Sequence, residues 1–196
     1  MDAARLQRVL ARIDELNRED PVTELVDGLP VPRELRYSQR LSDWVLRLDP
    51  GASEPLRIAA RGQHVRRWTI PREQYPMTRA GYLRWRETLK TFHMQTVGEL
   101  MRDAGYDDAT IERVRAIMSK RQLGTDADSQ TLEDALCLLF LEAQLADLRR
   151  KTPDETMRDV IRKTWRKMSP RAQTLATQLP LEADQRQFLL ESLAAG

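Results

Sequence analysis

Residues 132–148 read LEDALCLLFLEAQLADL, and this stretch decides the fold class. Between Ala135 and Leu141, apolar residues occupy nearly every side of the helix that it would form. A helix that is apolar all round is stable only when several neighbours cover it. The stretch therefore predicts a central buried helix in an all-α protein.

The segments on both sides carry apolar residues at helical spacing, separated by prolines, glycines and capping residues. They predict further helices over about residues 6–20, 37–48, 53–68, 78–105, 108–118, 153–168 and 182–193, and a short helix from residue 170. Residues 26–32 are expected to form a loop, because a glycine and two prolines interrupt them. No segment has the alternating pattern of a strand.

At 196 residues the chain has the length of one domain. We expect a single helical domain over residues 1–196, with a core over about residues 34–168. The terminal helices, over residues 170–194, are expected to pack on that core. The predicted fold class is therefore an all-α, single-domain multi-helix bundle.

The composition argues against a membrane protein and a secreted protein. Hydrophobic residues make up 41% of the chain and charged residues 32%, which is ordinary for a globular protein. The longest apolar run, Ala135–Leu141, is too short to cross a bilayer, and the N-terminal residues lack the apolar core of a secretion signal. Cys137 is the only cysteine, so no disulfide forms within the chain. We expect a cytoplasmic protein with no membrane contact.

The two histidines are the first candidates for a functional site. His64 and His93 fall on the apolar stripes of two different predicted helices, and Asp134 lies near the start of the central helix. Facing helices can project two imidazoles and a carboxylate into one pocket, where they hold Mn²⁺, Fe²⁺ or Zn²⁺ with a position open for water. His64, His93 and Asp134 are therefore the predicted metal ligands. The alternative is that both histidines are hydrogen-bonded residues of the core.

Other charged residues could serve the same site. Glu133 and Glu142 share the central helix with Asp134 and are candidate catalytic carboxylates, while Lys120 could reach a substrate phosphate. Helix capping is the alternative explanation for Glu133 and Asp134, and an ion pair with an arginine is the alternative for Glu142.

Basic residues are concentrated between Arg57 and Lys90, where only Glu73 and Glu87 oppose them. Arginines beside a metal would neutralise a phosphate group, which favours a phosphorylated small molecule or a nucleotide as substrate. The residues predicted to bind it are Arg61, Arg67 and Arg84.

Two other classes of function stay open. The basic stretch is interleaved with aromatic residues, which suits a non-catalytic module that binds RNA or a nucleotide. A protein-interaction domain in which the histidines are merely packed is the third class. No glycine-rich phosphate loop occurs, so no nucleotide cofactor is expected.

Several longer strings resemble one family. They are Tyr37-Ser38, AARGQHVRRW at residues 59–68, PREQYP at 71–76, GYLRWR at 81–86, His93, LEDALC at 132–137 and KTWRKMS at 163–169. The chain is similar over nearly its whole length to the bacterial and fungal domain of unknown function 4202, a family name that implies no activity.

Helix order and histidine placement also resemble those of the histidine/aspartate-site phosphohydrolases. This looser resemblance implies a metal-dependent hydrolase. In that superfamily an aspartate ligand directly follows the second histidine, whereas Met94 follows His93 here. The resemblance therefore implies a different ligand set, namely His64, His93 and Asp134, completed by Glu133 or water.

Overall fold

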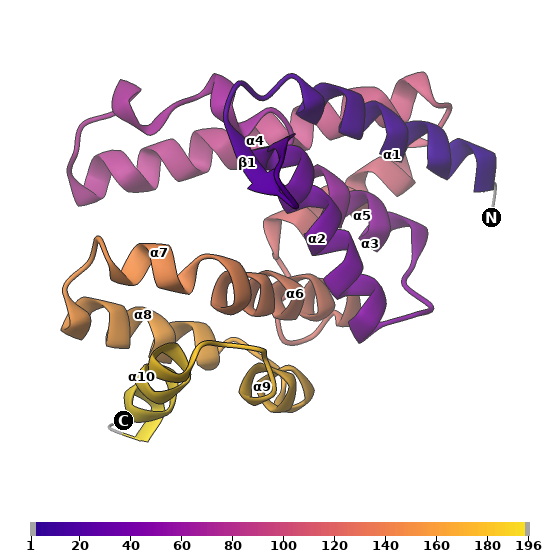
Figure 1. Ribbon diagram of the computed structural model, residues 1–196. Coiled ribbons are helices and arrows are strands. Elements are labelled where there is room, and N and C mark those ends of the chain that lie inside the picture. Colours follow the sequence, from indigo (N-terminus) through magenta and orange to yellow (C-terminus); the bar gives the residue numbers. More distant parts are fainter. Residues whose placement is uncertain (1–2, 195–196) are drawn as a thin grey trace.

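The computed structural model describes residues 3–194 and is almost entirely helical (Figure 1). The elements in chain order are α1 (Ala3–Arg18), β1 (Thr23–Val26), β2 (Leu29–Pro32), α2 (Arg33–Leu48), α3 (Glu54–Gly62), the 3₁₀ turns η1 (Arg67–Thr69) and η2 (Arg72–Gln74), α4 (Arg79–Asp103), α5 (Asp108–Ser119), α6 (Ala127–Ala143), α7 (Leu145–Arg149), α8 (Asp154–Trp165), α9 (Pro170–Thr177) and α10 (Ala183–Ala194). The all-α prediction is confirmed.

The helices form two stacked groups in the view of Figure 1. The β1–β2 hairpin, α1 and the long α4 lie above, whereas α6, α7, α8 and α10 lie below. Between these groups, α2 packs against both α3 and α6, and α3 packs against α5. At the C-terminal end, α9 contacts α6 and α10 contacts α8. No helix within residues 3–194 has the length and apolar character needed to cross a membrane.

The central helix is α6, as the opening stretch predicts. Its side chains are buried on most sides, including the polar Ser129, Glu133 and Asp134, and it joins a cluster of buried apolar residues that runs from Leu6 to Leu189. The predicted helix over 132–148 is divided, because α6 ends at Ala143 and α7 begins at Leu145.

Residues 26–32 are not the loop that their prolines suggest. Thr23–Val26 and Leu29–Pro32 pair as antiparallel strands, and the turn between them has positive φ at Asp27 and Gly28. Asp-Gly with two positive φ angles is a favoured two-residue hairpin turn. Proline is tolerated here because each strand of a two-stranded ribbon has an unpaired edge.

The hairpin also places the start of α2. Asp20 precedes it, and the Asp20 carboxylate accepts hydrogen bonds from the backbone N–H groups of Val22 and Glu34, each at 3.0 Å. The Asp20 side chain therefore anchors the first turn of α2 from outside the helix, which fixes the position of Glu34.

The third helix is shorter than predicted. It ends at Gly62, where a side-chain Cβ would lie 2.3 Å from Val97 Cγ2 of α4, so glycine allows α3 and α4 to approach closely. The chain then turns, and Arg66 adopts a left-handed conformation with φ of 52°. His64 consequently lies in this turn and not on a helical stripe, whereas His93 lies on α4 as predicted.

Candidate functional site

The two histidines meet, although they come from elements 29 residues apart in the sequence. The centroids of the His64 and His93 rings are 6.0 Å apart. The His64 ring also stacks on the Tyr37 ring, with the centroids 4.1 Å apart and the planes nearly parallel. Three elements therefore hold the imidazole pair in place: the turn that follows α3, helix α4 and helix α2.

Both histidines line a cavity of about 350 Å³, which we call the inner cavity. Four basic side chains line it with them, namely Arg67, Arg86, Lys90 and Lys120. Tyr82, which is 41% exposed, also lines it, and the Arg86 guanidinium lies 5.9 Å from its ring centre. Glu87 is the acidic residue of the same lining, so the inner cavity combines two imidazoles with a predominantly basic wall.

The imidazoles are uncharged at neutral pH. Burial lowers the pKa of His64 well below its usual value, and Arg67 and Arg86 lower this pKa further by charge repulsion. Burial likewise lowers the pKa of His93 to about 3, with a further contribution from His64. A neutral imidazole has one nitrogen that donates and one that accepts a hydrogen bond.

For His93 the hydrogen is on Nδ1. This atom lies 2.9 Å from the Val65 carbonyl oxygen, which can only accept. The buried Nε2 of His93 is therefore an acceptor, and none of residues 3–194 supplies it with a hydrogen-bond donor. Buried acceptors without a donor are rare in folded proteins, so this nitrogen is a candidate for contact with a ligand.

Glu34 is part of the same cluster, although its sequence context does not reveal it. Its side chain is buried, and Oε2 lies 3.4 Å from His64 Nδ1. Burial raises the pKa of Glu34 above its usual value, and the charges of Arg67 and Arg33 offset only part of this rise. In the sequence it looks like an ordinary acidic residue in the first turn of a helix, and only the hairpin brings it to His64.

The basic residues of the inner cavity are themselves held by contacts. Arg67 lies 4.7 Å from the centre of the Trp85 ring, and burial lowers its pKa. Lys120 follows α5 in a left-handed conformation with φ of 55°, and its Nζ forms an ion pair with Glu133. Glu133 also forms an ion pair with the Lys167 ammonium at 3.5 Å. Glu133 contacts Lys120, but it is not among the residues that line the cavity.

Asp134 does not join the histidines. Its carboxylate accepts hydrogen bonds from the backbone N–H of Ser169 at 2.8 Å, from Ser169 Oγ at 2.5 Å and from Gln130 Nε2 at 2.9 Å. Ser169 is the N-cap of α9. Asp134 therefore ties α6 to the start of α9, which is the role that the capping alternative implies.

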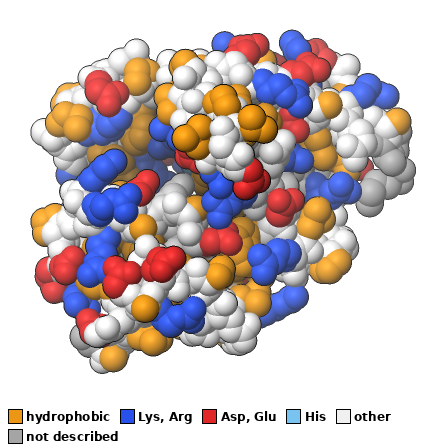
Figure 2. Space-filling model, viewed as in Figure 1, with side chains coloured by type: hydrophobic (Ala, Val, Ile, Leu, Met, Phe, Trp, Pro, Cys, Tyr) orange, Lys and Arg blue, Asp and Glu red, His pale blue; other side chains and the backbone are white. Residues whose placement is uncertain are grey.

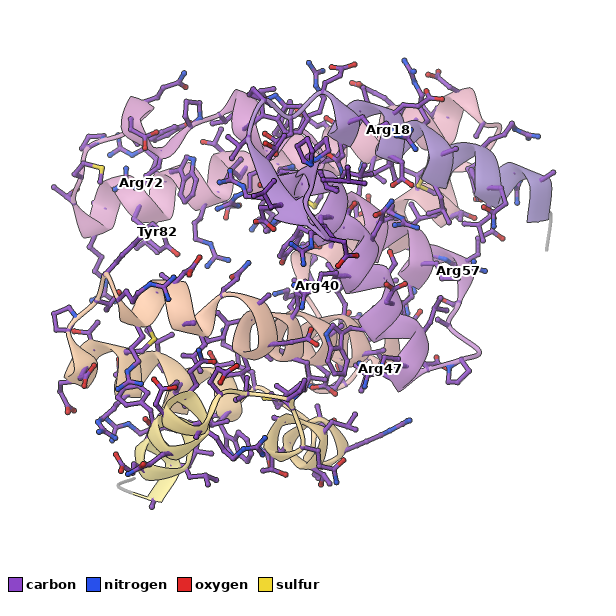
Figure 3. All side chains as sticks on the ribbon, in the orientation of Figure 1. Arg18, Arg40, Arg47, Arg57, Arg72 and Tyr82 are labelled. Atoms are coloured by element: carbon purple, nitrogen blue, oxygen red, sulfur yellow. The ribbon has the colours of Figure 1, made fainter. Side chains whose placement is uncertain are left out.

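Glu142 lies in a second and larger cavity of about 1040 Å³, the outer cavity. It accepts hydrogen bonds from Arg40 at 2.7 Å and from Trp44 Nε1 at 2.9 Å. The inner and outer cavities both include His64 and Arg67 in their walls. Figure 2 shows the surface hollowed between the groups of helices, and in Figure 3 Arg40 and Tyr82 lie along that hollow.

The other predicted arginines are not part of the inner cavity. Arg61 lies 3.6 Å from Asp14 in a half-buried ion pair, and Arg84 is exposed on α4 outside both cavities. Arg57, at the start of the basic stretch, lies at the right of the view in Figure 3, whereas Tyr82 of the inner cavity lies at the left. Only Arg67 of the three predicted substrate-binding arginines lines the inner cavity.

The predicted metal ligands are thus only partly brought together. Within residues 3–194 no group of three or more His, Cys, Asp or Glu side chains is arranged to hold a metal ion. Asp134 uses its oxygens on Ser169 and Gln130, so His64, His93 and Asp134 do not form one ligand set. Metal binding by the two histidines stays a prediction.

The fold and the site define an almost entirely helical protein with a pair of neutral histidines in the wall of a basic cavity. The chain belongs to the family described as the domain of unknown function DUF4202, whose model matches residues 7–189. No curated protein and no solved structure matches the chain. The function must therefore be argued from the cavity.

Proposed function

We propose that this protein is a hydrolase that binds a phosphorylated small molecule in the inner cavity. The observation that carries the proposal is the charge of that cavity. Arg67, Arg86, Lys90 and Lys120 surround two uncharged imidazoles. Cationic side chains that line one cavity favour an anion with several oxygens, because each oxygen accepts a charge-assisted hydrogen bond.

The acidic groups nearby do not cancel this preference. Lys90 pairs with Glu87 at 2.7 Å and Lys120 pairs with Glu133, whereas Arg86 has no acidic partner among the described residues and donates only to the Tyr82 hydroxyl at 3.4 Å. Arg86 is therefore free to turn toward a phosphate. The size of the cavity, about 350 Å³, lies in the range of small-molecule sites.

Tyr82 favours a nucleotide among phosphorylated ligands. Its ring is 41% exposed and lines the same cavity as the basic side chains. A nucleotide whose base stacks on this ring would have its phosphate within reach of Arg86. A mononucleotide such as AMP is consequently the best first probe.

The contacts made by the basic stretch favour a ligand bound in the cavity over an RNA bound on the surface. Arg72 donates to the carbonyl oxygens of Tyr75 and Pro76 at 2.9 and 2.8 Å, and Arg61 pairs with Asp14. Such arginines hold the fold and do not form one exposed basic face, which non-specific nucleic-acid binding needs.

A matched pair of substitutions on α4 tests the proposal. Arg86 and Arg84 are both exposed and lie two residues apart, but only Arg86 lines the inner cavity. In calorimetric titrations with AMP, Arg86→Ala should weaken binding by about 1 kcal/mol, or about fivefold, and Arg84→Ala should leave it unchanged. Adenosine, which lacks the phosphate, should bind much more weakly than AMP.

The result against the proposal is equally clear. Absence of AMP binding, or equal losses in both variants, would remove the inner cavity as a phosphate site. Release of inorganic phosphate from AMP, assayed with and without added Mn²⁺ or Zn²⁺, then tests the hydrolase half of the proposal. Binding without turnover under every condition would leave a nucleotide-binding protein.

A further inference from the structure

Glu34 is the buried carboxylate nearest to the two histidines, and phosphate binding gives it no role. It is 4% exposed, and its Oε2 lies 3.4 Å from His64 Nδ1. The nearest basic group, Arg33 Nε, is 3.8 Å from Oε1. Burying a carboxylate is costly unless it is paired or functional, so the contact with His64 needs an explanation.

The contacts of the two Nδ1 atoms indicate where each imidazole carries its hydrogen. The Val65 carbonyl oxygen fixes it on Nδ1 of His93. A carboxylate oxygen at 3.4 Å from His64 Nδ1 attracts a hydrogen at that nitrogen and repels a lone pair. The distance is longer than that of an ideal hydrogen bond, but such bonds commonly shorten when ligand binds.

Burial raises the pKa of Glu34 above its usual value, and the charges of Arg67 and Arg33 offset only part of this rise. Arg33 Nε, at 3.8 Å from Oε1, is the contact that stabilises the ionised form of Glu34. Burial lowers the pKa of His64, and the positive charges of Arg86 on α4 and of Lys120 after α5 lower it further. With Glu34 ionised beside Arg33, the pair is a carboxylate next to a neutral imidazole, and the second nitrogen of His64, Nε2, is left with a lone pair.

His64 is also the histidine that a ligand can reach. Its side chain is 21% exposed, and it borders both the inner and the outer cavity. His93 is 4% exposed. We propose that Glu34 is a positioning residue that makes His64 Nε2 the proton acceptor of the inner cavity.

The chemistry of this assignment rests on the proposed function. In the hydrolysis of a phosphomonoester, His64 Nε2 takes a proton from a water molecule while the water oxygen bonds to phosphorus. The bond between phosphorus and the ester oxygen breaks, and the imidazolium returns the proton to that oxygen. The products are an alcohol and inorganic phosphate, and no oxidant or further reactant is needed.

Nuclear magnetic resonance of the imidazole nitrogens tests the assignment without any ligand. The chain has only two histidines, so the spectrum contains two ring systems. At neutral pH, both Nδ1 atoms should resonate as hydrogen-bearing nitrogens and both Nε2 atoms as bare nitrogens. In Glu34→Met and Glu34→Gln the form with hydrogen on Nε2 should gain population at His64. His93, which Val65 holds, should not change and serves as the internal reference.

Control variants and contrary outcomes separate positioning from folding. Glu34→Asp keeps a carboxylate and should keep the wild-type forms, and Glu24→Gln removes an exposed carboxylate of the hairpin that pairs with Arg36 and should change neither ring. A wild-type His64 with its hydrogen on Nε2, or unchanged populations in both Glu34→Met and Glu34→Gln, would overturn the assignment.

The turnover measurement distinguishes this inference from the proposed function. If the protein hydrolyses AMP, Glu34→Gln should lower kcat by about a hundredfold with little change in KM. An equal loss in Glu24→Gln, or no loss in Glu34→Gln, would overturn the role of Glu34. A wild-type protein that does not bind AMP would contradict the proposed function, whereas the nitrogen spectra would still decide the position of the hydrogen on His64.

Discussion

Two groups of buried polar residues differ in how completely their hydrogen bonds are made. In the first, on α6, the Asp134 carboxylate accepts from Ser169 twice and from Gln130. In the second, between α2 and α4, His93 Nε2 has no donor among the described residues. Buried polar groups are normally satisfied, so the incomplete group is the one with capacity for a ligand.

The comparison separates residues that the sequence could not separate. Asp134, Glu142, His64 and His93 are all polar residues among apolar ones, and each is a candidate for a site. Both oxygens of Asp134 accept hydrogen bonds, from Ser169 and Gln130, whereas Glu142 accepts through Oε2, from Arg40 and Trp44. We infer that Asp134, which lines neither cavity, acts in the fold, and that the histidines act on a ligand.

The largest expected effect on stability comes from removing the Asp134 carboxylate, whose hydrogen bonds are all made. Asp134→Ala would leave the Ser169 donors and Gln130 without their acceptor and remove the tie between α6 and α9. We expect the free energy of unfolding to fall by about 3 kcal/mol, as measured by urea denaturation. The affinity for AMP of the protein that remains folded should not change, because Asp134 lines neither cavity.

Asp43→Ala is the matched control for this variant. Asp43 is an exposed aspartate within α2, so its removal should change the free energy of unfolding by less than about 0.5 kcal/mol. Loss of AMP binding in folded Asp134→Ala would contradict the division between the two groups.

A smaller effect comes from the pH dependence of the incomplete group. In the unfolded chain a histidine takes up a proton near its usual pKa, whereas burial, with the help of His64, lowers the pKa of His93 to about 3 in the folded protein. Between these pH values the unfolded state binds more protons, so the free energy of unfolding falls as the pH falls.

Replacing His93 with a residue that does not titrate should reduce this acid sensitivity. From about pH 6 to about pH 4, wild type should lose about 1.4 kcal/mol per pH unit more than His93→Gln, measured by urea denaturation at each pH. Glu34, whose pKa burial raises, contributes with the opposite sign in both proteins. Parallel curves for the two proteins would show that His93 is not buried in its neutral form.

Local patterns were enough to predict most of the fold. The apolar character of residues 132–148 indicated the central helix, and Thr78, Asp107 and Ser169 cap α4, α5 and α9 as their sequences suggest. The hairpin was missed because its prolines mask the strand pattern, although the Asp-Gly turn was present. Thr152, which stands before Pro153 as a cap residue would, does not cap α8, because Pro153 holds that position without a side-chain hydrogen bond.

The site was harder to predict because it depends on contacts between distant elements. His64, His93, Arg67 and Lys120 were all named from the sequence, and they do line one cavity. Glu34 was missed because the hairpin brings it to His64 across 30 residues of sequence. Asp134 was assigned to the same site because helical spacing says nothing about which neighbour a side chain meets.

The central claim is that the inner cavity holds a phosphate group beside the two histidines. The most direct measurement is a titration of the protein with inorganic phosphate, followed through the nitrogen resonances of the two imidazoles at several pH values. An anion among the cationic side chains should shift both rings saturably and raise the pKa of His64 and of His93, and Arg84→Ala should behave as wild type does. Resonances and pKa values of both histidines that do not respond to phosphate would contradict the account.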